Sequence, residues 1–192
     1  MKKIFLFVAL VSISAISFGQ LEQKDLVFEN NSFSRVFETK VSPATQYLNA
    51  KQWIAKTFGS YKAVVQFEDE NAHKIILKGK IVVSKDGEIN ETLKKWFQDK
   101  VTYSFTMTID IKEGRYRVKI EDVRASIETK TTPTDNPLAD PKISNREMTL
   151  EGYINWNERK ADLAFLREMH FKQEVVQLLN SLVNDINTVD DF

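Results

Sequence analysis

The chain of 192 residues contains no cysteine. Disulfide bonds, zinc–thiolate sites, thiol nucleophiles and a lipid-modified N-terminal cysteine are therefore excluded. Because no cross-link or cysteine-bound metal can stabilise the fold, the hydrophobic core must do so alone. Hydrophobic residues make up 42% of the chain, which is a sufficient share for such a core.

Histidine is nearly as scarce, and the familiar catalytic motifs are missing. His73 and His170 lie far apart, and no carboxylate spacing joins them into a metal-ligand set. His170 and Glu174 have the i, i+4 spacing of a helix face, which we interpret as a contact on a helix surface. The sequence has no phosphate-binding loop, no dinucleotide motif and no nucleophile elbow. We therefore expect a protein that is not an enzyme and that uses no cofactor and no metal.

Only one long hydrophobic run occurs, and it lies at the N-terminus. Two lysines precede the apolar run Ile4–Val11, and Ser17-Phe18-Gly19 places small residues before a cleavage site at Gln20. This pattern is typical of a secretory signal peptide over residues 1–19. The run is too short, and too rich in serine at its end, for a stable membrane span. We expect a periplasmic or secreted, soluble protein without stable membrane insertion.

The sequence also lacks an excess of charge of either sign. The whole chain has 27 basic and 27 acidic residues, and removal of the signal leaves 25 basic and 27 acidic ones, a net charge of −2. Such a balance provides no global field that would attract nucleic acid or anionic lipid. Nucleic acid is therefore not an expected partner.

The remaining 173 residues have the size of one domain. Residues 20–32 are mostly polar, and we expect them to form a loosely held N-terminal lead. Residues 33–187 are expected to form a single α+β domain.

Two helices are predicted in this domain. Ser42 is a favourable N-cap, Pro43 suits the first helical position and Gly59 suits the C-terminal cap, so the first helix covers 42–58. The second covers 159–187 and has an apolar stripe with helical spacing. The stripe consists of Val175, Leu178, Leu179, Leu182 and Ile186.

Strands are predicted from the alternation of apolar and polar residues. In Val101–Lys112 every odd-numbered residue is apolar and every even-numbered one is polar. Glu113-Gly114 predicts a tight hairpin turn, and a phase shift after Asp122 predicts a bulge in the return strand. Further strands are expected at 33–41, 62–68 and 73–84, and in the second of these alternation predicts that Ala63, Val65 and Phe67 are buried. Together they predict an antiparallel sheet with one apolar face, covered by the two helices, and one polar face.

In two connecting segments the apolar residues follow neither a helical spacing nor a strand alternation. The first, 86–100, contains Trp96 and Phe97. The second, 128–145, contains three prolines among Thr, Asp and Asn, and is expected to be a loop. Alternation resumes at 147–156, which predicts a short edge strand.

Residues 42–70, SPATQYLNAKQWIAKTFGSYKAVVQFEDE, and the hairpin IKEGRYRVKI resemble an exported Bacteroidota family described as a domain of unknown function with a TBP-like fold. The resemblance covers about residues 33–126. It implies an α+β fold in which a curved antiparallel sheet of about five strands has one face covered by two helices. It implies no activity, because fold does not carry function.

The polar sheet face is the first candidate contact surface. It is predicted to present a set of basic side chains, partly offset by Asp110 and Glu121. The set comprises Lys78, Lys80, Arg115, Arg117 and Lys119, together with Lys74. Such a face can bind an anionic polymer or partner. The simpler interpretation is an ordinary solvated face, whose lysines discourage pairing of sheet edges.

Trp96 and Phe97 are the second candidate, because a solvated loop has little use for two large rings. They could anchor a partner or ligand, and the alternative interpretation is a lid that folds back on the core.

These observations predict a non-catalytic binding or interaction module of the cell envelope. The partner is left open among an envelope protein, a peptide and a glycan. One alternative is a hydrolase or small-ligand enzyme with a concave polar pocket near 128–145. Another is a structural component of the envelope.

Overall fold

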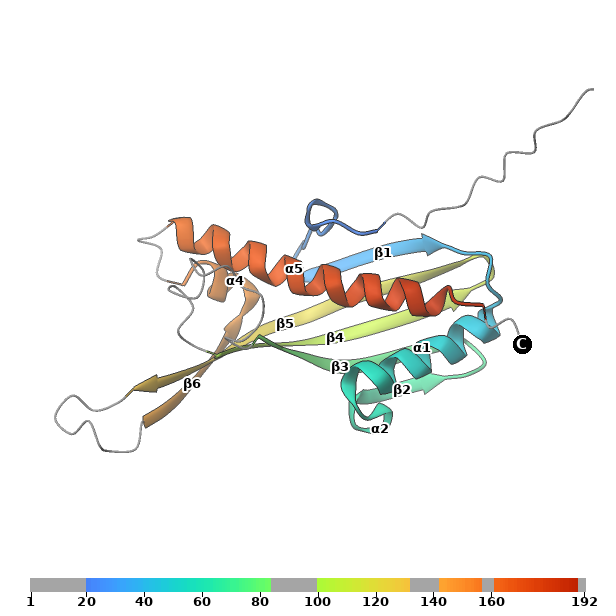
Figure 1. Cartoon of the computed structure of the whole chain (residues 1–192), viewed down its shortest axis with the longest axis horizontal. Helices are drawn as coiled ribbons and strands as arrows, with labels where there is room; N and C mark the ends of the chain where they lie inside the picture. Colours follow the sequence, from blue (N-terminus) through green and yellow to red (C-terminus); the bar gives the residue numbers. More distant parts are fainter. Residues whose placement is uncertain (1–19, 84–99, 132–141, 157–160, 190–192) are drawn as a thin grey trace, which may run out of the picture.

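The computed structural model describes residues 20–83, 100–131, 142–156 and 161–189. The predicted signal peptide, together with Trp96 and Phe97, lies outside the described residues. The described residues form one open antiparallel sheet and helices packed against one of its faces (Figure 1).

The sheet has six strands. They are β1 (Ser32–Glu38), β2 (Val65–Asp69), β3 (Lys74–Val83), β4 (Lys100–Lys112), β5 (Arg115–Thr131) and β6 (Lys142–Thr149). Their order is β1-β5-β4-β3-β2, and β6 pairs with the C-terminal part of the long strand β5. All pairings are antiparallel, as the alternating pattern predicted.

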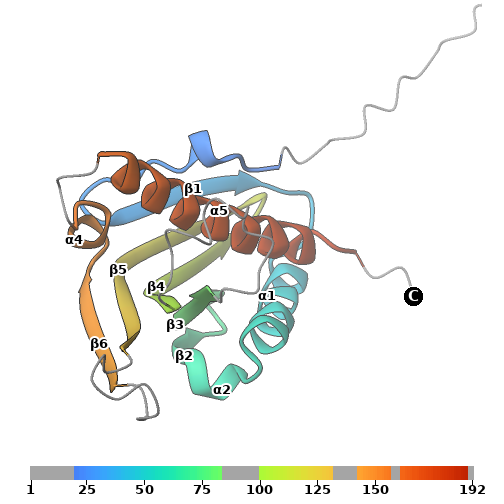
Figure 2. The ribbon, with the colours of Figure 1, turned by 60° about the vertical axis from the view of Figure 1, so that its left-hand side comes forward.

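Two long helices cover one face of this sheet. They are α1 (Pro43–Phe58) and α5 (Ala161–Ile186), and the sheet curves around them in Figure 2. The predicted caps of α1 are present, because Ser42 Oγ accepts from the Thr45 amide at 3.3 Å and Gly59 has a φ of 73°. The shorter helices are η1 (Gln23–Asp25), α2 (Tyr61–Val64) and α4 (Leu150–Ile154).

The alternation in β4 is confirmed. All six of its odd-numbered residues from Val101 to Ile111 are buried under the helices. Gly79 on β3 is needed for this packing, because a Cβ there would lie 2.5 Å from the Phe105 ring. The predicted bulge is also confirmed, since the β4–β5 register shifts between Ser104 and Thr106, opposite Asp122, whose φ is 58°.

The expectation of a loose N-terminal lead is wrong. Leu21 and Leu26 are 3% and 0% exposed and belong to the core. The Asn180 side chain on α5 accepts from the Leu21 amide at 2.8 Å and donates to its carbonyl at 3.1 Å. The segment is polar on average, but two leucines and one amide pair are enough to hold it against α5.

The strand expected at 62–68 is only partly present. Residues 61–64 form the helical turn α2, and the strand begins at Val65. A register shift between Val65 and Phe67 then turns Phe67 outward, so that its side chain is 49% exposed instead of buried.

The loop expected at 128–145 and the edge strand expected at 147–156 are both misplaced. β5 continues to Thr131, and β6 begins at Lys142, so the ends of the expected loop pair as an antiparallel arm. Figure 1 shows this arm extending beyond the helices. The strand ends at Thr149, whose hydroxyl accepts from the Gly152 amide at 3.1 Å and starts α4.

Candidate functional site

The face of the sheet opposite the helices, here called the open face, presents the six basic side chains predicted from the sequence, including Lys74 at the start of β3. On β3, Lys78 and Lys80 alternate with buried Leu77 and Gly79. On β5 the basic residues alternate with buried Tyr116, Val118 and Ile120, and they are Arg115, Arg117 and Lys119. β4 lies between these strands and contributes Thr and Ser side chains to the same face.

Ion pairs neutralise part of this charge. Asp110 on β4 lies between two basic neighbours, with its Oδ2 2.6 Å from Arg117 Nη2 and its Oδ1 3.4 Å from Lys74 Nζ. Burial by itself raises the pKa of Asp110. The hydrogen bond from Arg117 and the charge of Lys74 outweigh it, so the pKa is lowered overall. Lys119 is paired with Glu121 in the same way.

The Asp110 pairs predict a pH-dependent contribution to stability. Because the folded pKa lies below the unfolded value of 3.8, the contribution is present above pH 3.8 and is lost as the pH falls through the folded pKa. Asp110→Asn should lower the free energy of unfolding by about 0.5–1 kcal/mol at pH 7, since Arg117 is half exposed. Urea unfolding at several pH values measures this difference, which should disappear at the acid end.

The control for this prediction is Glu113→Gln in the hairpin turn. Glu113 is exposed and has no ion pair among the described residues. A pH dependence equal to that of Asp110→Asn would show that general charge, not the Asp110 pairs, is responsible.

Other lysines of the open face have no such pair among the described residues. Within the described part of the chain, Lys78, Lys80 and Lys100 have no carboxylate within 4.0 Å. Two of them border a groove of about 320 Å³ at the base of the β5–β6 arm. The groove is lined by Lys80, Lys100, Thr102, Ser104, Ser126, Glu128, Asn145 and Glu147.

This groove has the location that the alternative enzyme hypothesis requires, near 128–145. Its described lining offers hydroxyls, one amide and charged groups, but no histidine that could accept a proton from Ser104 or Ser126. Among the described residues no three His, Cys, Asp or Glu side chains are grouped to hold a metal ion. The described lining of the groove can provide hydrogen bonds and charge to a ligand.

The interpretation of His170 and Glu174 as a contact on a helix surface is wrong. His170 is 4% exposed, and its ring centroid lies 6.4 Å from that of Tyr103 in the core. Burial lowers the pKa of His170 and raises that of Glu174. His170 therefore belongs to the packing of α5 on the sheet, and Glu174 is half-buried beside it on the same helix.

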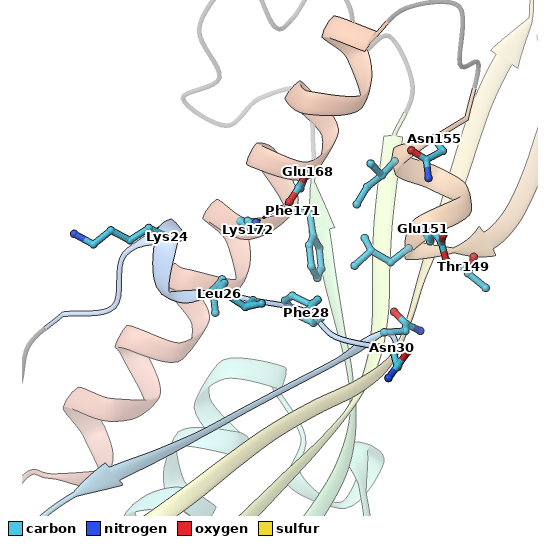
Figure 3. A pocket seen from close by; sticks show the side chains of 14 residues that line it. Lys24, Leu26, Phe28, Asn30, Thr149, Glu151, Asn155, Glu168, Phe171 and Lys172 are labelled. Atoms are coloured by element: carbon cyan, nitrogen blue, oxygen red, sulfur yellow. Dashed lines mark ion pairs between the residues drawn. The ribbon is translucent and has the colours of Figure 1, made fainter.

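Sequence reasoning missed a second concave site, here called the N-terminal cleft. It has a volume of about 660 Å³ and lies between the segment after η1, α4 and α5 (Figure 3). Phe28 and Phe171 meet edge to face inside it, with ring centroids 5.2 Å apart. The available signal was the apolar run Leu26–Phe28 within a mostly polar segment, followed by two asparagines at a turn.

The open antiparallel sheet, with two helices on one face and a solvent-facing polar surface on the other, defines an α+β protein of the TBP-like class. The family model described as "Domain of unknown function (DUF4468) with TBP-like fold" matches residues 33–126, and this segment of the chain belongs to that family. The resemblance inferred from residues 42–70 is thereby confirmed.

Two solved structures are similar to the chain. One is a TBP-like protein from Parabacteroides distasonis, with a TM-score of 0.52 and 15% identity over 82% of this chain and 97% of that one. The other is a DUF4468 family protein from Bacteroides ovatus, with a TM-score of 0.48 and 16% identity over 88% and 94%. At such identities the first likeness establishes the fold alone.

No curated protein matches the chain. In the part of the chain that the structure describes, every helix is too short or too polar to cross a membrane.

Proposed function

We propose that the protein is an exported, non-catalytic interaction module of the cell envelope that binds a partner through the open face. The observation that carries this proposal is a set of lysines without an ion pair among the described residues, Lys78, Lys80 and Lys100, of which the last two line the hydroxyl-containing groove. Residues 1–19 support export, because they have the pattern of a secretory signal.

The charges of the open face indicate the chemistry of the partner. Arg117, Lys119 and Lys74 already have carboxylates, whereas Lys78 and Lys80 have none among the described residues. A partner with carboxylates at alternate positions of an extended segment would meet Lys78 and Lys80, because successive outward side chains on a strand are two residues apart. Exposed apolar side chains on the same face add contact area, namely Val36 and Val82. An acidic protein segment or an acidic glycan fits this surface.

Lysine footprinting tests the proposal. A membrane-impermeant amine reagent is applied to cells with a permeabilised outer membrane and to the purified protein, and each modified lysine is quantified by mass spectrometry. Lys78, Lys80 and Lys100 should react several times more slowly in cells, because a bound partner covers them. Lys56 on α1, with a 79% exposed side chain, is the control for reagent access.

A charge-reversal variant sharpens this test. In Lys78→Glu with Lys80→Glu, the partner should dissociate, and Lys100 should then react in cells as fast as in the purified protein. Equal reactivity of the open-face lysines in wild-type cells and in solution, with Lys56 labelled in both, would contradict the proposal.

A further inference from the structure

The groove at the base of the β5–β6 arm has opposite charges on its two sides. Lys80 on β3 and Lys100 on β4 line one side. Glu128 on β5 and Glu147 on β6 line the other. The strands lie side by side here in the order β3-β4-β5-β6, so the two lysines and the two carboxylates are separated across the sheet. A ligand that complements both sides has a carboxylate at one end and a cation at the other.

The charges of the groove are available to such a ligand. Lys100 and Glu128 are directly opposite in the β4–β5 pairing, yet neither they nor Lys80 form an ion pair with a described residue. Glu147 has Arg124 at 3.9 Å, and both side chains are more than half exposed. An exposed pair at this distance contributes little, so a ligand can compete for the Glu147 carboxylate.

Between the charged sides, the lining of the groove is polar and uncharged. It consists of Thr102 and Ser104 on β4, Ser126 on β5 and Asn145 on β6. Hydroxyl and amide side chains both donate and accept hydrogen bonds, as the N–H and C=O groups of a peptide require. None of these side chains is buried, so a ligand in the groove can reach them.

The separation of the charges indicates the length of the ligand. The lysine side is centred between β3 and β4, and the carboxylate side between β5 and β6. These centres are two strand spacings apart, or about 10 Å. An extended peptide advances about 3.3 Å per residue, so three residues span this distance. The groove volume of about 320 Å³ lies at the lower end of the range of small-ligand sites.

We propose that this groove binds a short, extended peptide with a free ammonium group at one end and carboxylates at the other. The ammonium group lies over Glu128 and Glu147. The carboxylates lie over Lys80 and Lys100. This inference rests on the proposed function, because it specifies the chemistry of the partner at the open face. An acidic glycan fits less well, since it has no cation for the two glutamates and would bring its own carboxylates close to them.

The test is a titration of the isotope-labelled mature chain, residues 20–192, followed by NMR of its backbone amides. The first probe is the tripeptide Ala-Ala-Glu, which has one ammonium group and, on its last residue, two carboxylates. It should bind saturably and shift the amide signals of Thr102 and Ser126. N-acetylation of the tripeptide removes the ammonium group and should weaken the binding about fivefold.

Two double variants connect this difference to the groove. In Glu128→Gln with Glu147→Gln, the free and the N-acetylated tripeptide should bind equally, because the carboxylates for the ammonium group are removed. Glu38→Gln with Glu113→Gln removes two negative charges from exposed positions at the other end of the sheet, and the fivefold difference should remain. Thermal unfolding confirms that each variant is folded.

Three results would overturn this inference. The first is the absence of saturable binding of Ala-Ala-Glu. The second is equal affinity of the wild type for the free and the N-acetylated tripeptide. The third is tighter binding of trigalacturonate, an acidic glycan titrated in parallel, than of the tripeptide. The last two results would leave the proposed function in place, because an acidic ligand would still bind the open face. The lysine footprint in cells decides the proposed function separately.

Discussion

Replacement of Trp53 by alanine is expected to lower the free energy of unfolding by about 3–5 kcal/mol. The Trp53 side chain on α1 is 1% exposed, and its ring contacts Phe58 edge to face with centroids 5.7 Å apart. Its Nε1 donates to Ser181 Oγ on α5 at 3.1 Å, so the indole joins the two helices that cover the sheet. Without it, α1 and α5 would border a large cavity. Denaturant unfolding, followed by circular dichroism, measures the loss.

Two milder variants separate the contributions of this residue. Trp53→Phe retains most of the ring, and Ser181→Ala retains the indole but removes its acceptor. Ser181→Ala should cost about 1–3 kcal/mol, because it leaves a buried N–H without a partner. If Trp53→Ala were no more destabilising than Ser181→Ala, the packing of α1 on α5 would not be the main contribution of Trp53.

Leu26→Ala is expected to cost about 2–5 kcal/mol, although Leu26 lies in a segment that is polar on average. Its side chain is 0% exposed and belongs to the main core. The same segment is tied to α5 through the Asn180 amide, so a loss of packing at Leu26 should also loosen the contact at Leu21. Urea unfolding gives the change in stability, and hydrogen exchange of the Leu21 amide reports the local loosening.

The adjacent residue provides a matched control for this prediction. Val27 is 62% exposed, and Val27→Ala should change the stability by no more than about 0.5 kcal/mol. Similar small effects at positions 26 and 27 would mean that the N-terminal segment contributes little to the fold.

The central hairpin could be predicted from the sequence because the residues that determine it are neighbours in the chain. In β4, side chains alternate at every residue from Val101 to Ile111, and only one strand register buries all the apolar ones. Gly114 supplies the positive φ of the turn, and the phase shift after Asp122 marks the bulge. The caps of α1 are equally local, since Ser42 and Gly59 act within one turn of the helix.

Other parts could not be predicted because their stabilising contacts are distant in sequence. Leu21 is held by Asn180, and no local period indicates such a pair. The β5–β6 arm depends on pairing across a proline-containing segment, so its strands looked like loop residues. Phe67 was assigned to the core by alternation, but a bulge against β3 turned it outward.

The two candidate sites also differ in how far they could be predicted from the sequence. The basic residues of the open face follow from strand parity, because Lys78 and Lys80 must point away from Leu77 on the same strand. The N-terminal cleft required the packed fold, since Phe28 and Phe171 come from opposite ends of the chain. The ion pairs of Asp110 were also a tertiary result, because Asp110 on β4 meets Lys74 on β3 and Arg117 on β5 across the strands.

By itself, the sequence determined the faces of the sheet, the ends of the first helix and the residues exposed on the polar side. These features follow from backbone periods and caps that act over a few residues. Tertiary structure alone decided the burial of the N-terminal segment, the extension of the arm and the shape of the cleft. Each of these depends on contacts between distant segments, and their free energy appears only when the core has brought those segments together.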